Sequence, residues 1–253
     1  MFDLLRRKTW AVIIPLCLLG VGFVAFTFFA PTIHVPQGGE TPDAVLGERV
    51  PFLTVPEGFA ATYFAKGVKG ARVMEWDAAG RMLVSQTSEG LVSVLTDLDG
   101  DGTAEQTKVL IDGLDAPHGL AMRCHVNGCD LFVATRNALL RYPYESKTAT
   151  VSEPEKLLDI VGDLTDRHKT RSIMFLGQPF ENTLLISVGS SCDACHEEDD
   201  MRGRILAYDT RTGELSEYAR GLRNAVFMTL DPMNGFVFMT EMGRRGLGDT
   251  TQP

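Results

Sequence analysis

"AAGRMLVSQTSEGLVSVLTD" (residues 78–97) has the pattern of a turn, a strand, a second turn and a second strand. The whole pattern or its first half recurs in "NGCDLFVATRNALLRYPYE" (127–145), "ENTLLISVGSS" (181–191) followed by "RGRILAYDT" (202–210), and "MNGFVFMTEMG" (233–243). The first strand positions, Arg81, Asp130, Thr183 and Phe236, are 49, 53 and 53 residues apart. A period near 50 made only of strands is typical of propeller blades. Two packed β-sandwiches would also contain many strands, but they would not explain the regular step.

The predicted fold is therefore all-β, a β-propeller with about four blades over residues 51–253, the last of them incomplete. A partial ring leaves open sheet edges and an uncovered core face. We therefore expect the sequence to be part of a longer one, and we expect residues 35–253 not to fold stably as a monomer.

The N-terminus differs from the rest of the chain. Three basic residues at positions 6–8 precede an apolar run over residues 10–30, which as a helix would rise about 30 Å, the thickness of a hydrocarbon core. We predict a cytoplasmic stub and a transmembrane signal anchor over residues 1–34, followed by a linker over 35–50. The predicted architecture is thus a β-propeller preceded by an N-terminal transmembrane helix. A cleaved signal peptide is the alternative. The basic cluster predicts a single-pass protein of a bacterial inner membrane with its globular part in the periplasm.

Charge and cysteine content limit the function classes. A net charge of −9 and a pI near 5.1 argue against a nucleic-acid partner, because no basic stripe supplies phosphate contacts. Four cysteines of the exported part form two close pairs, and disulfides are permitted in an oxidising compartment. Cys124 and Cys129 flank the turn "HVNG" and are candidates for a small cross-strand disulfide.

The second pair lies in "SSCDACHEEDD" (190–200), a C-x-x-C-H pattern made by Cys192, Cys195 and His196. This pattern attaches c-type haem in exported proteins, which would make the chain an electron carrier. However, predicted strands lie directly before and after this loop, and its four acidic residues 197–200 are poor neighbours for a porphyrin. We favour a loop disulfide or a thiol pair.

"TDLDGDGTAE" places Asp97, Asp99 and Asp101 at alternate positions before Gly102, as in the first half of an EF-hand loop. Lys108 stands where that loop has its bidentate Glu. A structural calcium site and a solvated hairpin turn both remain open here.

Six segments occur in an order that resembles the pyrroloquinoline-quinone (PQQ) dependent sugar dehydrogenases, the glucose/sorbosone dehydrogenase family. They are residues 55–95, "LDAPHGLAM" (114–122), "DRHKTRSIMF" (166–175), "SVGSSC" (187–192), "YARGLRNAVFMTLDPMNG" (218–235) and "TEMGRRGLGD" (240–249). The resemblance covers roughly residues 53–253. It implies a six-bladed propeller with PQQ over the central channel, Ca²⁺ beneath the PQQ, and oxidation of a sugar or related alcohol in the periplasm, with electrons passing to a respiratory acceptor.

The resemblance also implies roles for individual residues. His168 matches the catalytic base, and histidine titrates in the range that such a base needs. Arg223 and Asn224 match the pair that contacts PQQ and substrate; a guanidinium suits carboxylates and the charge that develops on a quinone. The role of Arg171 stays open, and for His118 we expect structural packing at the channel rim.

The metal loop of the family matches Gly243 and Arg244, whose backbone carbonyls would bind Ca²⁺. The sequence departs from the family pattern here: Met242 replaces a polar residue, and Arg244 and Arg245 place positive charge beside the expected cation. The alternative to the enzyme is therefore a non-catalytic propeller that serves as a binding or assembly module.

Overall fold

The computed structural model describes residues 47–161 and 167–245, and every regular element in these two ranges is a β-strand. The predicted signal anchor lies outside the described residues. Within the described part, no helix has the length and apolarity that crossing a membrane requires. The described residues other than 56–59 belong to one compact unit. Residues 56–59, which belong to another, form a turn closed by Phe59 N–H donating to the Pro56 carbonyl at 3.1 Å.

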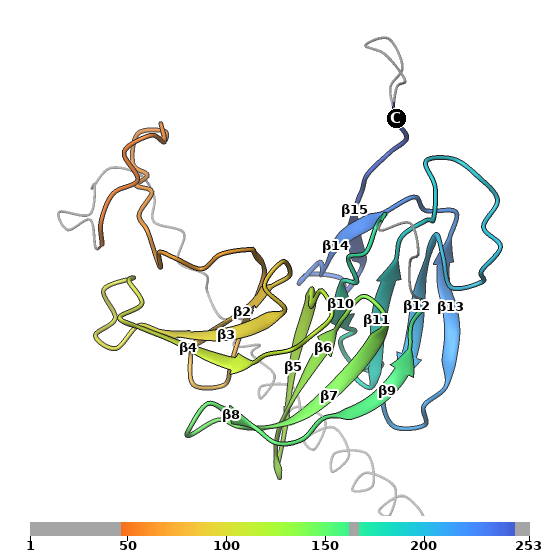
Figure 1. Ribbon diagram of the computed structural model, residues 1–253, viewed down its shortest axis with the longest axis horizontal. Helices are drawn as coiled ribbons and strands as arrows, with labels where there is room; N and C mark the ends of the chain where they lie inside the picture. Colours follow the sequence, from red (N-terminus) through yellow and green to blue (C-terminus); the bar gives the residue numbers. More distant parts are fainter. Residues whose placement is uncertain (1–46, 162–166, 246–253) are drawn as a thin grey trace, which may run out of the picture. The chain divides into compact units, whose positions relative to one another are not determined.

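Four antiparallel sheets follow one another along the chain (Figure 1). The first has the order β1-β2-β3-β4 and comprises β1 (Ala71–Trp76), β2 (Met82–Gln86), β3 (Leu91–Thr96) and β4 (Gln106–Ile111). Its two central strands are the strands predicted from residues 78–97. Each connection is short, so the sheet is a simple meander.

The second sheet comprises β5 (Gly119–His125), β6 (Gly128–Ala134), β7 (Ala138–Glu145), β8 (Thr150–Val151) and β9 (Glu155–Asp159). Both β8 and β9 pair with β7, so together they form one interrupted outer strand. Pro154, which lies between them and cannot donate a ladder hydrogen bond, accounts for the interruption.

The third sheet has the order β10-β11-β12-β13, and two further strands pair in a fourth sheet. These strands are β10 (Ile173–Phe175), β11 (Thr183–Val188), β12 (Arg204–Asp209), β13 (Leu215–Arg220), β14 (Ala225–Leu230) and β15 (Val237–Glu241). The arrangement is consistent with a β-propeller-like fold, and the predicted repeat corresponds to the second strand of each sheet.

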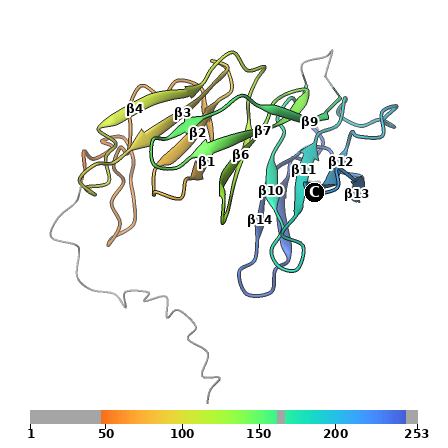
Figure 2. The ribbon, with the colours of Figure 1, turned by 90° about the horizontal axis from the view of Figure 1, so that it is seen from below.

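The first strands of the four sheets lie side by side: β1 contacts β5, β5 contacts β10, and β10 contacts β14. Figure 2 shows β10 and β14 next to each other. Gly119 N–H donates to the Arg171 carbonyl at 2.9 Å between the second and third sheets. A Cβ atom on Gly119 would lie 2.4 Å from that carbonyl oxygen, so the approach requires glycine. Residues of all four first strands line a pocket of about 480 Å³, as expected for a propeller channel.

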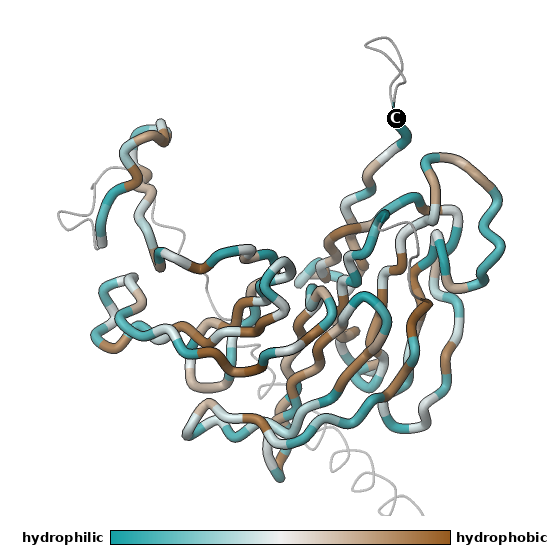
Figure 3. The backbone as a smooth tube through the Cα atoms, viewed as in Figure 1, coloured by the Kyte–Doolittle hydropathy of each residue, from teal (hydrophilic) through white to brown (hydrophobic). Residues whose placement is uncertain are grey.

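The hydrophobic core is divided into layers between neighbouring sheets. Figure 3 shows that apolar residues are concentrated along the strands. On β6, Leu131 and Val133 pack toward the first sheet, whereas Phe132 and Ala134 pack toward the third. Side chains alternate between the two faces of a strand, so a sheet with neighbours on both faces needs a continuous apolar run. The apolar run of β6 is explained by this double burial.

Candidate functional site

The loop before β10 carries His168 in an unusual backbone conformation. Its φ of 46° lies in the left-handed region, which non-glycine residues seldom adopt. The fully buried Arg171 donates from Nη1 to the carbonyls of His168 and Thr170 at 2.6 and 3.0 Å, and from Nη2 to that of Val161 at 3.1 Å. Arg171, whose role the sequence left open, therefore holds the backbone of the predicted base. Strain held in this way is frequent at functional sites.

The imidazole of His168 is half-buried and oriented by Ser190. Its Nδ1 lies 2.7 Å from the Ser190 carbonyl oxygen and 3.2 Å from the Ser190 hydroxyl oxygen. That hydroxyl donates to the Cys192 carbonyl at 2.7 Å. Because a carbonyl can only accept, Nδ1 carries a proton, and in the neutral imidazole the lone pair therefore lies on Nε2. This is the tautomer that a general base requires.

Gly189, at the end of β11, lies between His168 and Asn224. A Cβ atom on Gly189 would lie 2.6 Å from both the His168 Cβ and the Asn224 Oδ1. Any larger residue would force the two predicted site residues apart. Sequence reasoning missed this role, although Gly189 belongs to the quoted segment "SVGSSC".

Arg223 and Asn224 are fixed at the start of β14 by Glu241 on β15. One oxygen of that carboxylate, Oε1, accepts from Arg223 N–H at 2.7 Å and from Asn224 N–H at 3.1 Å. The Arg223 carbonyl accepts from Ser190 N–H at 2.7 Å, which joins this segment to the loop that orients His168. The two segments are thus connected through the residue that also binds the imidazole.

The Arg223 side chain pairs with Asp193. Nε and Nη2 lie 3.0 and 2.9 Å from Asp193 Oδ1, and Nη1 donates to the Met242 carbonyl at 3.1 Å. The backbone N–H of Arg245, followed by the charge of Arg223, lowers the pKa of the Asp193 carboxyl below its ordinary value. Asp193 is therefore a carboxylate at neutral pH. No signal in the sequence pointed to this residue.

Arg167, His168, Asp193, Arg223 and Arg245 together line a pocket of about 250 Å³. Three arginines and one carboxylate contribute to this lining, so the pocket favours an anion. The structure thus brings together His168 and Arg223, which are far apart in the sequence, and adjacent Asn224 contacts Gly189 beside them.

Gly243 and Arg244, predicted as calcium ligands, line a different pocket of about 480 Å³, which shares Asp193 and Arg223 with the first. Its described lining carries five arginines and three carboxylates: Arg202, Arg204, Arg220, Arg223, Arg244, Asp193, Glu197 and Glu241. This charge balance does not fit a dication. Met242, Arg244 and Arg245, where the sequence departs from the family pattern, also argue against a calcium ion at this loop.

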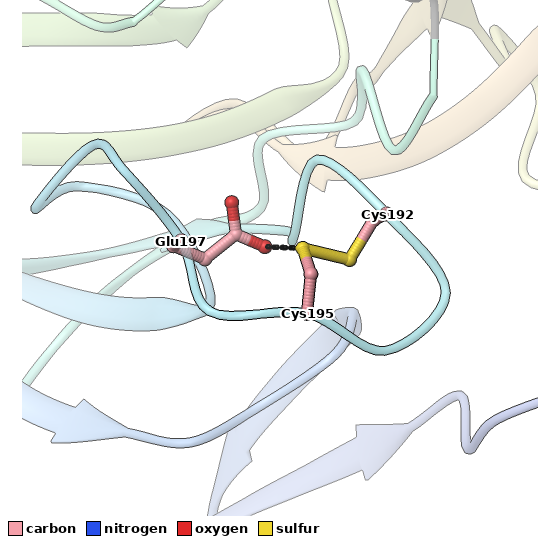
Figure 4. A group of neighbouring side chains, drawn as sticks. All are labelled: Cys192, Cys195 and Glu197. Carbon is pink, nitrogen blue, oxygen red and sulfur yellow. Dashed lines mark hydrogen bonds between the residues drawn. A yellow bond between two sulfur atoms is a disulfide. The ribbon is translucent and has the colours of Figure 1, made fainter.

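Both cysteine pairs form disulfides. Cys124–Cys129 joins paired positions of β5 and β6, and Cys192–Cys195 closes the loop between β11 and β12, with Glu197 Oε1 3.7 Å from Cys195 Sγ (Figure 4). With both sulfurs of the second pair in this bond, neither is available for the thioether links of c-type haem.

The carboxylates of Asp97, Asp99 and Asp101 converge in the turn between β3 and β4, with Glu105 as a fourth member that the sequence analysis missed. They accept backbone hydrogen bonds inside the turn, such as Gly102 N–H to Asp97 Oδ2 at 2.9 Å. A structural calcium ion here stays a prediction.

His118 differs from His168 in every contact. It is fully buried, and neither ring nitrogen has a hydrogen-bond partner of normal geometry among the described residues. Its ring centroid lies 6.0 Å from that of Phe227 on β14. Burial, followed by the charge of Arg72, lowers the pKa of His118 to about 4. It is a neutral packing residue, in agreement with its predicted structural role.

Comparisons with solved structures give the same fold. The chain is 22% identical to the holo form of the PQQ domain of pyranose dehydrogenase from Coprinopsis cinerea (TM-score 0.60, 70% of this chain and 45% of that chain). It is 26% identical to a calcium structure of Trichoderma reesei carbohydrate-active enzymes family AA12 (TM-score 0.60, 70% and 47%). For the PQQ-bound aldose sugar dehydrogenase from Streptomyces coelicolor, the identity is 18% (TM-score 0.55, 72% and 59%). The chain thus matches only about half of the length of these proteins.

No curated protein sequence matches the chain. The family model described as TrAA12-like matches residues 53–251, nearly all of the chain after the predicted linker. Together with the solved neighbours, this match agrees with the predicted propeller-like fold, and two of those neighbours are PQQ-containing proteins by name. The chain belongs to the TrAA12-like family.

Proposed function

We propose that the chain is the PQQ-binding part of an oxidoreductase that removes hydride from a sugar or a sugar-derived alcohol or aldehyde. One observation carries the proposal. The segment before β10 brings His168, and the segment before β14 brings Arg223 and Asn224, to the same place beside Gly189 and Ser190. The TrAA12-like match and the PQQ-containing neighbours support it.

The residues of the pocket of about 250 Å³ fit PQQ in charge. PQQ carries three carboxylates, and the lining offers three guanidinium groups. When bound, PQQ would supply the two-electron acceptor for the hydride. Arg223 would pair with one of its carboxylates, and Asn224 would offer amide contacts to the quinone or the substrate.

His168 would act on the substrate rather than on the cofactor. Because Nδ1–H is held by the Ser190 carbonyl, Nε2 is free to accept the hydroxyl proton of the substrate. The left-handed backbone and the Arg171 contacts fix the imidazole before substrate arrives. Preorganisation of this kind lowers the barrier without further movement of the base.

Calcium is proposed as a second cofactor of the whole protein, supported by the calcium structure of the Trichoderma reesei relative. The lining at Gly243 and Arg244 does not fit it, and no step of the reaction is assigned to it. We also propose the predicted anchor, the periplasmic location and transfer of electrons to a respiratory acceptor; these rest on the sequence.

Reconstitution of the full chain with PQQ tests the proposal. We expect quinone absorbance that survives desalting and reduction of an artificial dye when sugars are supplied. The same assay with added Ca²⁺ or with a chelator determines whether the metal contributes. Loss of all quinone absorbance on desalting, from protein whose circular dichroism shows the folded sheets, would contradict the proposal.

A non-catalytic binding or assembly module is the second candidate. The arginine-rich lining beside Gly243 and Arg244 favours it, because the expected metal site is altered. Under this alternative, the folded chain retains no PQQ and reduces no dye at any calcium concentration.

A further inference from the structure

The Cys192–Cys195 loop contains an acidic residue that no part of the proposed reaction uses. Asp193 lies inside this loop, and the disulfide joins residues only three positions apart around it. The loop is therefore short and covalently closed beside the candidate site. A closed loop of this size has few conformations available.

Asp193 contacts its described neighbours through one oxygen. Oδ1 accepts from Nε of Arg223 at 3.0 Å and from the backbone N–H of Arg245 at 3.2 Å, and it forms an ion pair with Nη2 of Arg223 at 2.9 Å. The Met242 carbonyl accepts from Nη1 of Arg223 at 3.1 Å. The guanidinium is thus held at three nitrogens by described residues.

The hydrogen bonds of the Arg223 guanidinium do not use all of its donors. A guanidinium has five N–H groups, and the hydrogen bonds to Asp193 and Met242 use two of them, on Nε and Nη1. The other N–H groups belong to Nη1 and Nη2. A carboxylate ligand can accept from such a pair of N–H groups together.

We propose that Asp193, held in place by the Cys192–Cys195 disulfide, is the positioning residue that orients Arg223 toward a carboxylate of the bound ligand. This inference rests on the proposed function, because it takes PQQ as that ligand. Asp193 acts through Arg223 and does not itself contact the reacting atoms. The disulfide then determines how well the pocket is prepared for the cofactor.

Opening the disulfide should weaken the site. An added dithiol donates two electrons and two protons to the S–S bond, which leaves two cysteine thiols, and the dithiol itself becomes a cyclic disulfide. The opened loop no longer confines Asp193, and Arg223 loses its fixed orientation. We expect the Kd for PQQ to rise about tenfold, a typical effect of lost preorganisation.

The experiment compares two disulfide variants of the full chain, Cys192→Ser/Cys195→Ser and Cys124→Ser/Cys129→Ser. PQQ is titrated into each by absorbance, with and without the dithiol. The wild type and the second variant should bind tightly and lose affinity with dithiol; the first variant should bind weakly in both conditions. Equal affinity of all three proteins without dithiol would overturn the inference.

A readout that needs no cofactor separates this inference from the proposed function. The Nε–H resonance of Arg223, assigned with the Arg223→Lys variant, should be sharp and protected in the wild type and broadened in Cys192→Ser/Cys195→Ser and in Asp193→Ala. A protected resonance in those variants refutes the positioning role. Protection lost as expected, in a protein that never retains PQQ, would support the positioning of Arg223 and overturn the proposed function.

Discussion

The segments that precede β5 and β10, the first strands of two sheets, each carry a histidine, and the two histidines have opposite roles. Before β5, His118 is fully buried against Phe227 and is neutral, with a pKa lowered to about 4. Before β10, His168 is half-buried, lines an arginine-rich pocket and is oriented by the Ser190 carbonyl. The same residue type in a similar place is therefore a core residue in one case and a candidate base in the other. The burial of each ring and its hydrogen bonds decide between these two roles.

The largest difference should appear when each histidine is replaced. For His168→Gln we expect dye reduction to fall by about 10²–10⁴-fold, because a general base contributes about that much, while the unfolding midpoint stays unchanged. For His118→Leu we expect activity to be retained. Steady-state kinetics and urea unfolding of both variants test this. A comparable loss of activity in the two variants would contradict the assignment of His168 as the base and of His118 as a packing residue.

The second test removes the group that holds the His168 backbone. Arg171→Leu leaves the carbonyls of Val161, His168 and Thr170 without their donors. We expect the free energy of unfolding to fall by about 3–5 kcal/mol, since buried unsatisfied groups cost about 1–3 kcal/mol each. Denaturant unfolding measures this. Arg171→Lys serves as the control, because it keeps the charge but loses the fork of donors.

The third test uses pH. His118 is neutral in the folded chain down to about pH 4, whereas in the unfolded chain it takes up a proton near pH 6.5. The unfolded state thus binds more protons between these values, so stability falls as pH is lowered through this window, by about 3 kcal/mol in total. Urea midpoints of the wild type should show the decrease, and His118→Leu should lack that component. A decrease of the same size in the variant would assign it to other groups.

The smallest expected effect concerns Gly189, which allows His168 and Asn224 to lie close together. A methyl group at Gly189 meets the His168 Cβ and the Asn224 Oδ1, which are side-chain atoms. We expect Gly189→Ala to lower the free energy of unfolding by about 1–3 kcal/mol, the usual cost of overpacking, and to lower kcat because the base is displaced. Gly119→Ala is the matched comparison: its methyl group meets the backbone of Arg171. It should reduce stability and leave the ratio of activity to folded protein unchanged.

Sequence reasoning predicted the strands well and the site in part. The repeat through Arg81, Asp130, Thr183 and Phe236 places the second strand of each sheet, because alternation and turn residues are local signals. The motifs around His168 and Arg223 came from the resemblance to a family. Asp193, Gly189 and Glu241 were missed, since their roles depend on contacts with segments that are distant in the chain.

The sequence by itself determined the all-β class, the period near 50 residues, the cysteine pairs and the order of the family segments. These features follow from the secondary-structure preferences of neighbouring residues and from the spacing of motifs, and both can be read along the chain. The tertiary structure alone decided that His168 and Arg223 share a pocket, that His118 is buried in the core, and that Arg171 supports the backbone of the base. Distances between residues of different sheets are set by how the sheets pack, and no periodicity along the chain encodes them.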